Sequence, residues 1–131
     1  MSTDAAKTIL VVEDAEAVRG LIVEQLSKQG YKTLEVTDGE EALNKLRTHE
    51  VDLVCLDLAL PLQSGFSVCE AIRADPLLKH LPILVITART GLQDYSRALE
   101  LGANRFLEKP FKARDLLAHV KELIVATNAP R

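Results

Sequence analysis

The sequence predicts an α/β fold, with a doubly wound, five-stranded parallel sheet covered by helices on both faces. Three observations predict it: short apolar runs of strand length recur along the chain, amphipathic stretches of helix length separate them, and acidic or hydroxyl residues follow several of the runs. Alternating strands and helices form parallel sheets, and such sheets carry their sites beyond the carboxyl ends of the strands. The same pattern therefore locates a candidate site.

Apolar runs of strand length occur at five places. Three are continuous, as is typical of strands buried on both faces: residues 9–12, Leu53–Leu56 and residues 83–86. The other two, Lys32–Val36 and Arg105–Glu108, are more mixed in character, which indicates strands at the edges of the sheet.

Helices are expected between these strands. The first has one shared face made of Val18, Leu21, Ile22, Gln25 and Leu26. The last has an apolar face made of Leu116, Val120, Leu123 and Ile124. Gly30 predicts the end of the first helix, and Asp38 with Glu41 resembles a capping pair that opens a helix reaching Leu46. A loop over residues 75–81 leads to Pro82, which suits the start of a strand.

The length and charge of the chain restrict the classes of protein to which it can belong. At 131 residues the chain is long enough for one domain, so residues 1–131 are interpreted as a single domain, with residues 126–131 as a tail or a severed linker. The 16 basic and 19 acidic residues give a net charge of −3 without a basic block, which argues against direct nucleic-acid binding. The longest apolar runs are only of strand length, so neither a membrane span nor a signal peptide is expected.

Two cysteines and three histidines give no sign of a disulfide or a metal centre. Cys55 lies in an expected strand and Cys69 in an expected helix, and both are predicted to be buried free thiols, which fits a reducing cytoplasm. His49, His80 and His119 lie far apart without ligand-like spacing and are interpreted as ordinary surface residues.

Three acidic residues follow two of the continuous strands. Glu13 and Asp14 come directly after residues 9–12, and Asp57 comes directly after Leu53–Leu56. Carboxylates gathered at one edge of a sheet repel one another unless a cation shares them, and hard oxygen ligands suit Mg²⁺. Glu13 and Asp14 alone would fit an ordinary acidic pair at a helix N-terminus. Together with Asp57 they predict a metal site suited to phosphoryl chemistry.

An aspartate that takes a phosphoryl group must be ionised, exposed and close to a divalent cation, and Asp57 has the expected location. Asp14 is expected to bind Mg²⁺ directly and Glu13 through water. A backbone carbonyl just after Asp57, that of Ala59, is expected to complete the protein's share of the ligands.

Two further residues at strand ends complete the expected chemistry. Lys109 follows the last strand, where its ammonium group is expected to reach Asp57 or a phosphate on it. Thr87 ends the fourth strand, and its hydroxyl is expected to swing to the new phosphoryl oxygens as a switch.

Four motifs in chain order resemble the receiver domains of two-component response regulators, the chemotaxis-type doubly wound fold, over nearly the whole chain. They are Val11-Val12-Glu13-Asp14, Leu56-Asp57-Leu58-Ala59-Leu60-Pro61 with Gly65, Thr87-Ala88, and Lys109-Pro110-Phe111. The resemblance implies a flavodoxin-like (βα)5 fold with strand order 2-1-3-4-5. It also implies that a histidine kinase or histidine phosphotransfer protein phosphorylates Asp57 with Mg²⁺, and that Thr87 and Phe106 move together as the switch.

The resemblance further implies where partners bind. A downstream effector protein or domain is expected on the surface of the fourth helix, fifth strand and fifth helix. Kinase specificity is expected on the exposed face of the first helix, around Ala15, Val18 and Arg19. Asn104-Arg105 stands where winged-helix transcription factors of the superfamily carry two acids that help to form a symmetric dimer, so a monomer or a weak phosphorylation-dependent dimer is expected.

Two details of the site also follow from the resemblance. The Lys109-Pro110 bond is expected to be cis, which costs little before proline. Ala59 and Arg89 occupy positions that in the family influence the lifetime of the phosphoryl group, so altered self-dephosphorylation is expected. The chain is not expected to be an enzyme, since it accepts and hydrolyses phosphoryl groups only on its own Asp57.

Three alternatives remain open at this point. The chain fits a stand-alone regulator and also the receiver module of a longer protein, such as a diguanylate cyclase, a hybrid sensor kinase or a transcription regulator. A phosphatase of the haloacid-dehalogenase type uses similar residues, but Ala59 stands where that class needs a second aspartate. A pseudo-receiver that binds partners without phosphorylation is disfavoured because all the acceptor residues are present.

Overall fold

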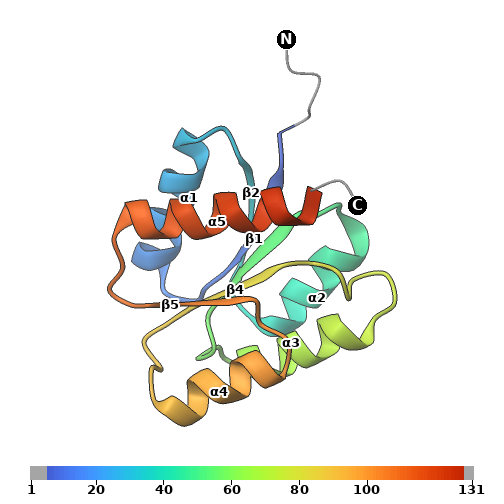
Figure 1. Cartoon of the computed structure of the whole chain (residues 1–131). Helices are drawn as coiled ribbons and strands as arrows, with labels where there is room; N and C mark the ends of the chain where they lie inside the picture. The colour runs from blue at the N-terminus through green and yellow to red at the C-terminus, as the bar shows by residue number, and fades with distance from the viewer. Residues whose placement is uncertain (1–5, 129–131) are drawn as a thin grey trace.

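The computed structural model describes residues 6–128, which form one sheet with helices on both faces (Figure 1). Strands and helices alternate from the first strand to the last helix. The strands are β1 (Thr8–Val12), β2 (Lys32–Val36), β3 (Leu53–Leu56), β4 (Ile83–Thr87) and β5 (Arg105–Glu108). The helices are α1 (Glu16–Lys28), α2 (Gly39–Thr48), α3 (Gly65–Ala74), α4 (Leu92–Glu100) and α5 (Ala113–Asn128).

The sheet is parallel throughout, with strand order β2-β1-β3-β4-β5. This confirms the predicted fold class and strand order, and it confirms β2 and β5 as the edge strands. The three central strands are the continuous apolar runs, because a strand between two neighbours and two helical layers meets no water on either face. Every residue of β3 and β4 is buried.

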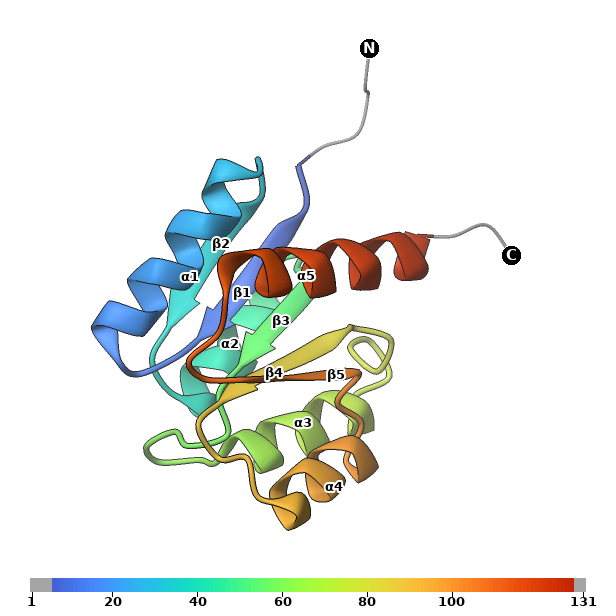
Figure 2. The same ribbon diagram turned by 60° about the vertical axis from the view of Figure 1, so that its left-hand side comes forward.

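Two helical layers cover the sheet. Helices α1 and α5 lie on one face, and α2, α3 and α4 lie on the other (Figure 2). Side chains therefore alternate along β1: Ile9 and Val11 pack toward α1 and α5, whereas Leu10 and Val12 pack toward α2 and α3. The four residues predicted for the apolar face of the last helix are all buried. Each face of the sheet thus has its own apolar core.

The apolar face of α1 differs from the prediction at one residue. Ile22 and Leu26 are fully buried and Val18 packs against the core, but Leu21 is 45% exposed. Successive residues in a helix are separated by about 100°, so Leu21 lies on the flank of the stripe centred on Ile22. Spacing alone did not show where the stripe ended.

The predicted helix boundaries are largely confirmed. Asp38 accepts a hydrogen bond from the backbone N–H of Glu41 at 2.8 Å and caps α2. Gly30 has φ +91° just after α1, a conformation that suits glycine at a helix end. Helix α5 continues to Asn128, so the first three residues of the predicted tail are helical, while residues 129–131 lie outside the described range.

Residues 6–128 contain no candidate membrane-spanning helix. None of the helices described there combines the length and the hydropathy that crossing a bilayer requires.

Candidate functional site

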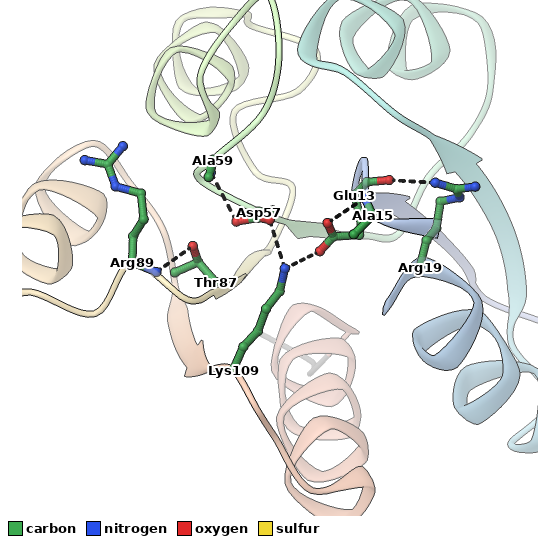
Figure 3. Close-up of polar contacts among 8 residues, drawn as sticks. All are labelled: Glu13, Ala15, Arg19, Asp57, Ala59, Thr87, Arg89 and Lys109. Carbon is green, nitrogen blue, oxygen red and sulfur yellow. Dashed lines mark hydrogen bonds and ion pairs between the residues drawn. The ribbon is translucent and has the colours of Figure 1, made fainter. Parts of the chain in front are cut away.

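The carboxyl ends of four strands meet at one edge of the sheet and bring the predicted residues together. Glu13 follows β1, Asp57 follows β3, Thr87 ends β4 and Lys109 follows β5 (Figure 3). The register places the ends of β1 and β3 side by side, since Val12 pairs with Leu56. Residues separated by up to 96 positions in sequence therefore share one site.

Three carboxylates form the centre of the site. Glu13, Asp14 and Asp57 each contribute an oxygen, and these three oxygens lie within 4.8 Å of one another. Asp57 was expected to be exposed but is only 5% exposed, because it continues the pairing of β3 with β1 by one residue. Glu13 is also buried, whereas Asp14 is exposed. The negative charges of the two buried carboxylates repel each other, and the three oxygens together could hold a cation.

Lys109 brings a positively charged side chain to the carboxylates of the site. Its Nζ atom donates to Oε1 of Glu13 at 2.5 Å and to Oδ2 of Asp57 at 2.9 Å. The lysine side chain is 17% exposed. The peptide bond between Lys109 and Pro110 is cis, as expected.

Burial and hydrogen bonding have opposing effects on the pKa values of Glu13 and Lys109. Burial raises the pKa of Glu13 and repulsion from Asp57 adds to this effect, while hydrogen bonds from Lys109 and from the Ala15 N–H oppose it. For Lys109 burial acts to lower the pKa, but its hydrogen bonds and attraction to Glu13 and Asp57 outweigh burial, so the pKa is raised. Lys109 is thus held as the charged partner of two carboxylates.

Backbone contacts hold Asp57 in place. Its N–H donates to the carbonyl of Val12 at 3.1 Å, which continues the β1–β3 pairing by one residue. Its Oδ1 atom accepts a hydrogen bond from the N–H of Ala59 at 3.1 Å. Gly65 packs so closely behind it that a Cβ at that position would lie 2.3 Å from the Asp57 carbonyl oxygen. The Asp57 side chain therefore has a defined orientation, with Oδ2 directed to Lys109 (Figure 3).

Glu13 is anchored through its backbone as well as its side chain. Its N–H donates to the carbonyl of Val36 at 3.1 Å, and its Oε2 atom accepts from the N–H of Ala15 at 3.0 Å. The carbonyl of Glu13 accepts from Nη1 of Arg19 at 3.0 Å. Arg19 was expected on the surface that faces a kinase, but its side chain is only 17% exposed. It turns toward residues 13–15, the loop that carries Glu13 and Asp14 and is called the acidic loop below. No local signal in the sequence distinguished this inward arginine from a solvated one.

Thr87 is fully buried at the end of β4. Its Oγ1 atom accepts a hydrogen bond from the N–H of Arg89 at 3.1 Å, so the hydroxyl is tied to the loop before α4. The guanidinium group of Arg89 points away from Lys109 and pairs with Asp94 at 3.0 Å (Figure 3).

Phe106 lies outside the charged cluster. Its half-buried ring packs edge-on against Tyr95 of α4, with the ring centroids 5.2 Å apart. Sequence reasoning selected Phe106 but missed Tyr95, because the pairing depends on how α4 packs beside β5.

The cysteines and histidines take no part in the site. Cys55 and Cys69 are both buried and free, as predicted. His49 and His80 are exposed, while His119 is half-buried beside Arg105, 3.2 Å from its Nη1 atom.

The sequence profile described as the response regulator receiver domain matches residues 9–121. The chain belongs to that family. The profile spans β2 to β5 and α1 to α4 entirely, together with most of β1 and the first part of α5, so the receiver domain accounts for nearly the whole fold.

Curated relatives of this receiver domain include longer regulators. The chain is 41% identical over 118 residues to the alkaline phosphatase synthesis transcriptional regulatory protein PhoP of Bacillus subtilis, covering 90% of this chain and 48% of that protein. It is 38% identical over 118 residues to the transcriptional regulatory protein GltR of Pseudomonas aeruginosa, covering 90% and 49%. The chain thus spans about half the length of the curated relatives that it matches.

Solved structures with the same fold come from several organisms. The signal receiver domain of a histidine kinase from Syntrophus aciditrophicus is 32% identical, with a TM-score of 0.89 and 96% of each chain covered. The receiver domain of the sensor histidine kinase PA1611 from Pseudomonas aeruginosa is 32% identical, with a TM-score of 0.85 and coverage of 92% of this chain and 98% of that one. That structure is described with a magnesium ion coordinated in its active-site cleft.

Proposed function

We propose that the chain is a phosphorylation-dependent switch of a two-component system in which Asp57 accepts the phosphoryl group. The observation that carries this proposal is the contact of 2.9 Å between Lys109 Nζ and Asp57 Oδ2 beside an acidic cluster. A charged lysine next to a carboxylate acceptor is where a transferred phosphoryl group needs positive charge. The proposal covers residues 1–131 as a single receiver domain with a short tail.

The donor set fits Mg²⁺. All the available side-chain ligands are carboxylate oxygens, and three of them lie within 4.8 Å of one another. Asp14 and Asp57 would bind the ion directly, Glu13 through water, and the carbonyl of Ala59 would complete the protein's ligands. When bound, Mg²⁺ would neutralise negative charge on the oxygens of the incoming phosphoryl group.

The transfer itself is a displacement at phosphorus. A carboxylate oxygen of Asp57 forms a bond to phosphorus while the bond from phosphorus to the donor's histidine nitrogen breaks, and the electron pair returns to that nitrogen, which takes up a proton. Lys109 holds the acceptor oriented before transfer and stabilises the phosphoryl oxygens after it. Hydrolysis reverses the modification: water attacks phosphorus, inorganic phosphate leaves and the Asp57 carboxylate is regained.

Signal output is proposed to begin at Thr87. Its hydroxyl would leave the Arg89 N–H and hydrogen-bond to the new phosphoryl oxygens, which pulls on the loop before α4. Phe106 would follow, since its ring contacts Tyr95 of the same helix. The surface of α4, β5 and α5 would then present a changed shape to an effector protein or domain. Ala59, two residues after Asp57, and Arg89, two residues after Thr87, would influence the lifetime of the phosphoryl group.

The cellular setting follows from the same chemistry. A histidine kinase or histidine phosphotransfer protein is the proposed donor, and the cytoplasm is the proposed compartment. The chain is proposed to act as a monomer or a weak phosphorylation-dependent dimer, without direct contact with nucleic acid. Whether the receiver acts alone or as a module of a diguanylate cyclase, a hybrid sensor kinase or a transcription regulator determines its output.

Intact-mass measurement after incubation with Mg²⁺ and acetyl phosphate tests the proposal. Addition of one phosphoryl group is expected, with no addition to an Asp57→Asn variant or to wild type in chelator. If wild type binds Mg²⁺ but acquires no phosphoryl group from acetyl phosphate or from histidine phosphotransfer proteins, the chain is a pseudo-receiver and the proposal is wrong.

A further inference from the structure

Arg19 links the acidic loop to the edge of the sheet. It lies in the first turn and a half of α1, and its guanidinium group makes two contacts in different directions. Nη1 donates to the carbonyl of Glu13 at 3.0 Å, and Nε donates to Oε1 of Glu35 on β2 at 3.1 Å. The Arg19 side chain is 17% exposed, whereas that of Glu35 is 48% exposed. An arginine suits this arrangement because its planar fork carries several donors in a fixed geometry.

The loop that Arg19 contacts lacks the usual means of support. Ala15 occupies the N-cap position of α1 and makes no side-chain cap hydrogen bond. Alanine is among the weakest N-cap residues, and the side-chain oxygen of a serine, threonine or aspartate would ordinarily hold such a turn. Here Glu13 accepts from the Ala15 N–H through its own side chain, and Arg19 reaches back from inside the helix to the Glu13 carbonyl. The turn is therefore held from both sides of Glu13.

The Glu13 carbonyl that Arg19 contacts belongs to the peptide unit between Glu13 and Asp14. Because a peptide unit is planar, fixing the direction of the Glu13 oxygen also fixes the N–H of Asp14 and the direction in which its Cα follows. Asp14 is exposed, so packing of its own side chain does little to orient it. The Arg19 contact thus restricts the orientation of Asp14, which is the only exposed residue of the three in the acidic cluster.

We infer that Arg19 is a positioning residue for the Mg²⁺ site: it orients the peptide between Glu13 and Asp14, while Glu35 aims its guanidinium group. The inference rests on the proposed function, because it concerns the metal site of that switch. On this inference Arg19 belongs to the metal site. A surface that meets a kinase would then consist of Ala15 and the exposed face of α1.

Electrostatics and positioning make opposite predictions for the loss of Arg19. Removing a positive charge near a cation site strengthens cation binding if charge alone matters. Removing a contact that orients a ligand weakens binding, and loss of such supporting contacts typically costs about 10-fold or more in metal affinity. The sign of the change therefore separates the two effects.

Titration calorimetry with Mg²⁺ at constant ionic strength tests the inference on the whole chain. Arg19→Met is expected to raise the Kd for Mg²⁺ by about 10-fold. Arg19→Lys keeps the charge but replaces the fork with a single ammonium group, and it is expected to raise the Kd by about 3-fold or more. Arg105→Met is the matched control, because it breaks a similar ion pair, with Glu122 at 2.7 Å, outside the acidic loop. It should leave the Kd unchanged.

Thermal unfolding in chelator accompanies each titration, since a purely structural role would lower the Tm without changing the Kd of the folded protein. An unchanged or lower Kd for Arg19→Met would overturn the inference while leaving the proposed function intact. Absence of Mg²⁺ binding by wild type would overturn the metal part of the proposed function itself. If Arg19→Met fails to fold, Arg19→Lys decides the question, because an unchanged Kd in that variant also overturns the inference.

Discussion

Lys109 and Asp57 are separated by 52 positions in sequence, yet Nζ of the lysine lies 2.9 Å from Oδ2 of the aspartate. The same Nζ atom contacts Glu13, so a single ammonium group serves two buried carboxylates. An arrangement with two buried negative charges and one positive charge favours a further cation, which supports the proposed Mg²⁺ site.

Loss of Lys109 should destabilise the protein in a metal-dependent way. In Lys109→Met, Glu13 and Asp57 face each other without their cation, and the free energy of unfolding in chelator should fall by about 2–3 kcal/mol. Mg²⁺ should restore more stability to this variant than to wild type. Urea unfolding with and without Mg²⁺ measures both quantities. Lys112→Met, at an exposed position nearby, is the control, and an equal loss in the two variants would contradict the assigned role.

Gly65 is required by close packing behind Asp57. Gly65→Ala would place a Cβ 2.3 Å from the Asp57 carbonyl oxygen and 2.7 Å from the Leu58 Cα, so the loop has to move. The free energy of unfolding should fall by about 2–3 kcal/mol, and phosphorylation by acetyl phosphate should slow.

Gly20→Ala is the matched control for that change. A Cβ at Gly20 meets nothing within 4 Å, and alanine favours the helix, so stability should rise by about 0.5–1 kcal/mol. Chemical unfolding of both variants measures the difference. Equal effects at the two glycines would show that packing behind Asp57 is looser than the structure indicates.

Arg73 should matter for stability but not for the site. Its guanidinium group donates to the carbonyls of Lys79, Leu81 and Gly102 and to Oδ1 of Asn104, joining the loop before β4 to the turn before β5. Arg73→Met should lower the free energy of unfolding by about 2 kcal/mol and leave the Kd for Mg²⁺ unchanged. Arg47→Met, on the exposed side of α2, should change neither quantity. A weaker Mg²⁺ affinity in Arg73→Met would contradict this separation of stability from function.

Both thiols should resist alkylation while the protein is folded. Burial raises the pKa of Cys55 from 9.0 to about 12 and that of Cys69 from 9.0 to about 11, so at pH 8 the reactive thiolate is nearly absent. Iodoacetamide should add to neither residue in buffer and to both in urea, as mass spectrometry would show.

The same pKa shifts predict how stability varies in alkali. Because burial raises their pKa, the thiols should ionise near pH 9 in the unfolded chain but only near pH 11 to 12 in the folded protein. Their contribution is constant below pH 9, and above it the free energy of unfolding should fall as pH rises. Cys55→Ala and Cys69→Ala variants should show less of this decline than wild type.

Local patterns in the sequence predicted the elements and most residues of the candidate site. Residues 53–56 are apolar without interruption, which a strand buried on both faces requires, and Asp57 follows where that strand leaves the core. Asp38 and Glu41 marked the start of α2 because capping is a contact between near neighbours in the chain. Strand order came from the resemblance to receiver domains, since periodicity does not say which strands are neighbours.

Only the tertiary structure decided which side chains meet and which face outward. Lys109 reaches both Glu13 and Asp57 because β1, β3 and β5 end at one edge of the sheet, and the distances depend on register and twist. Arg19 turns inward to the Glu13 carbonyl, while Leu21, two residues later, stays 45% exposed. Side-chain type and spacing are properties of a short segment, whereas contact distances are set by packing between segments far apart in the chain.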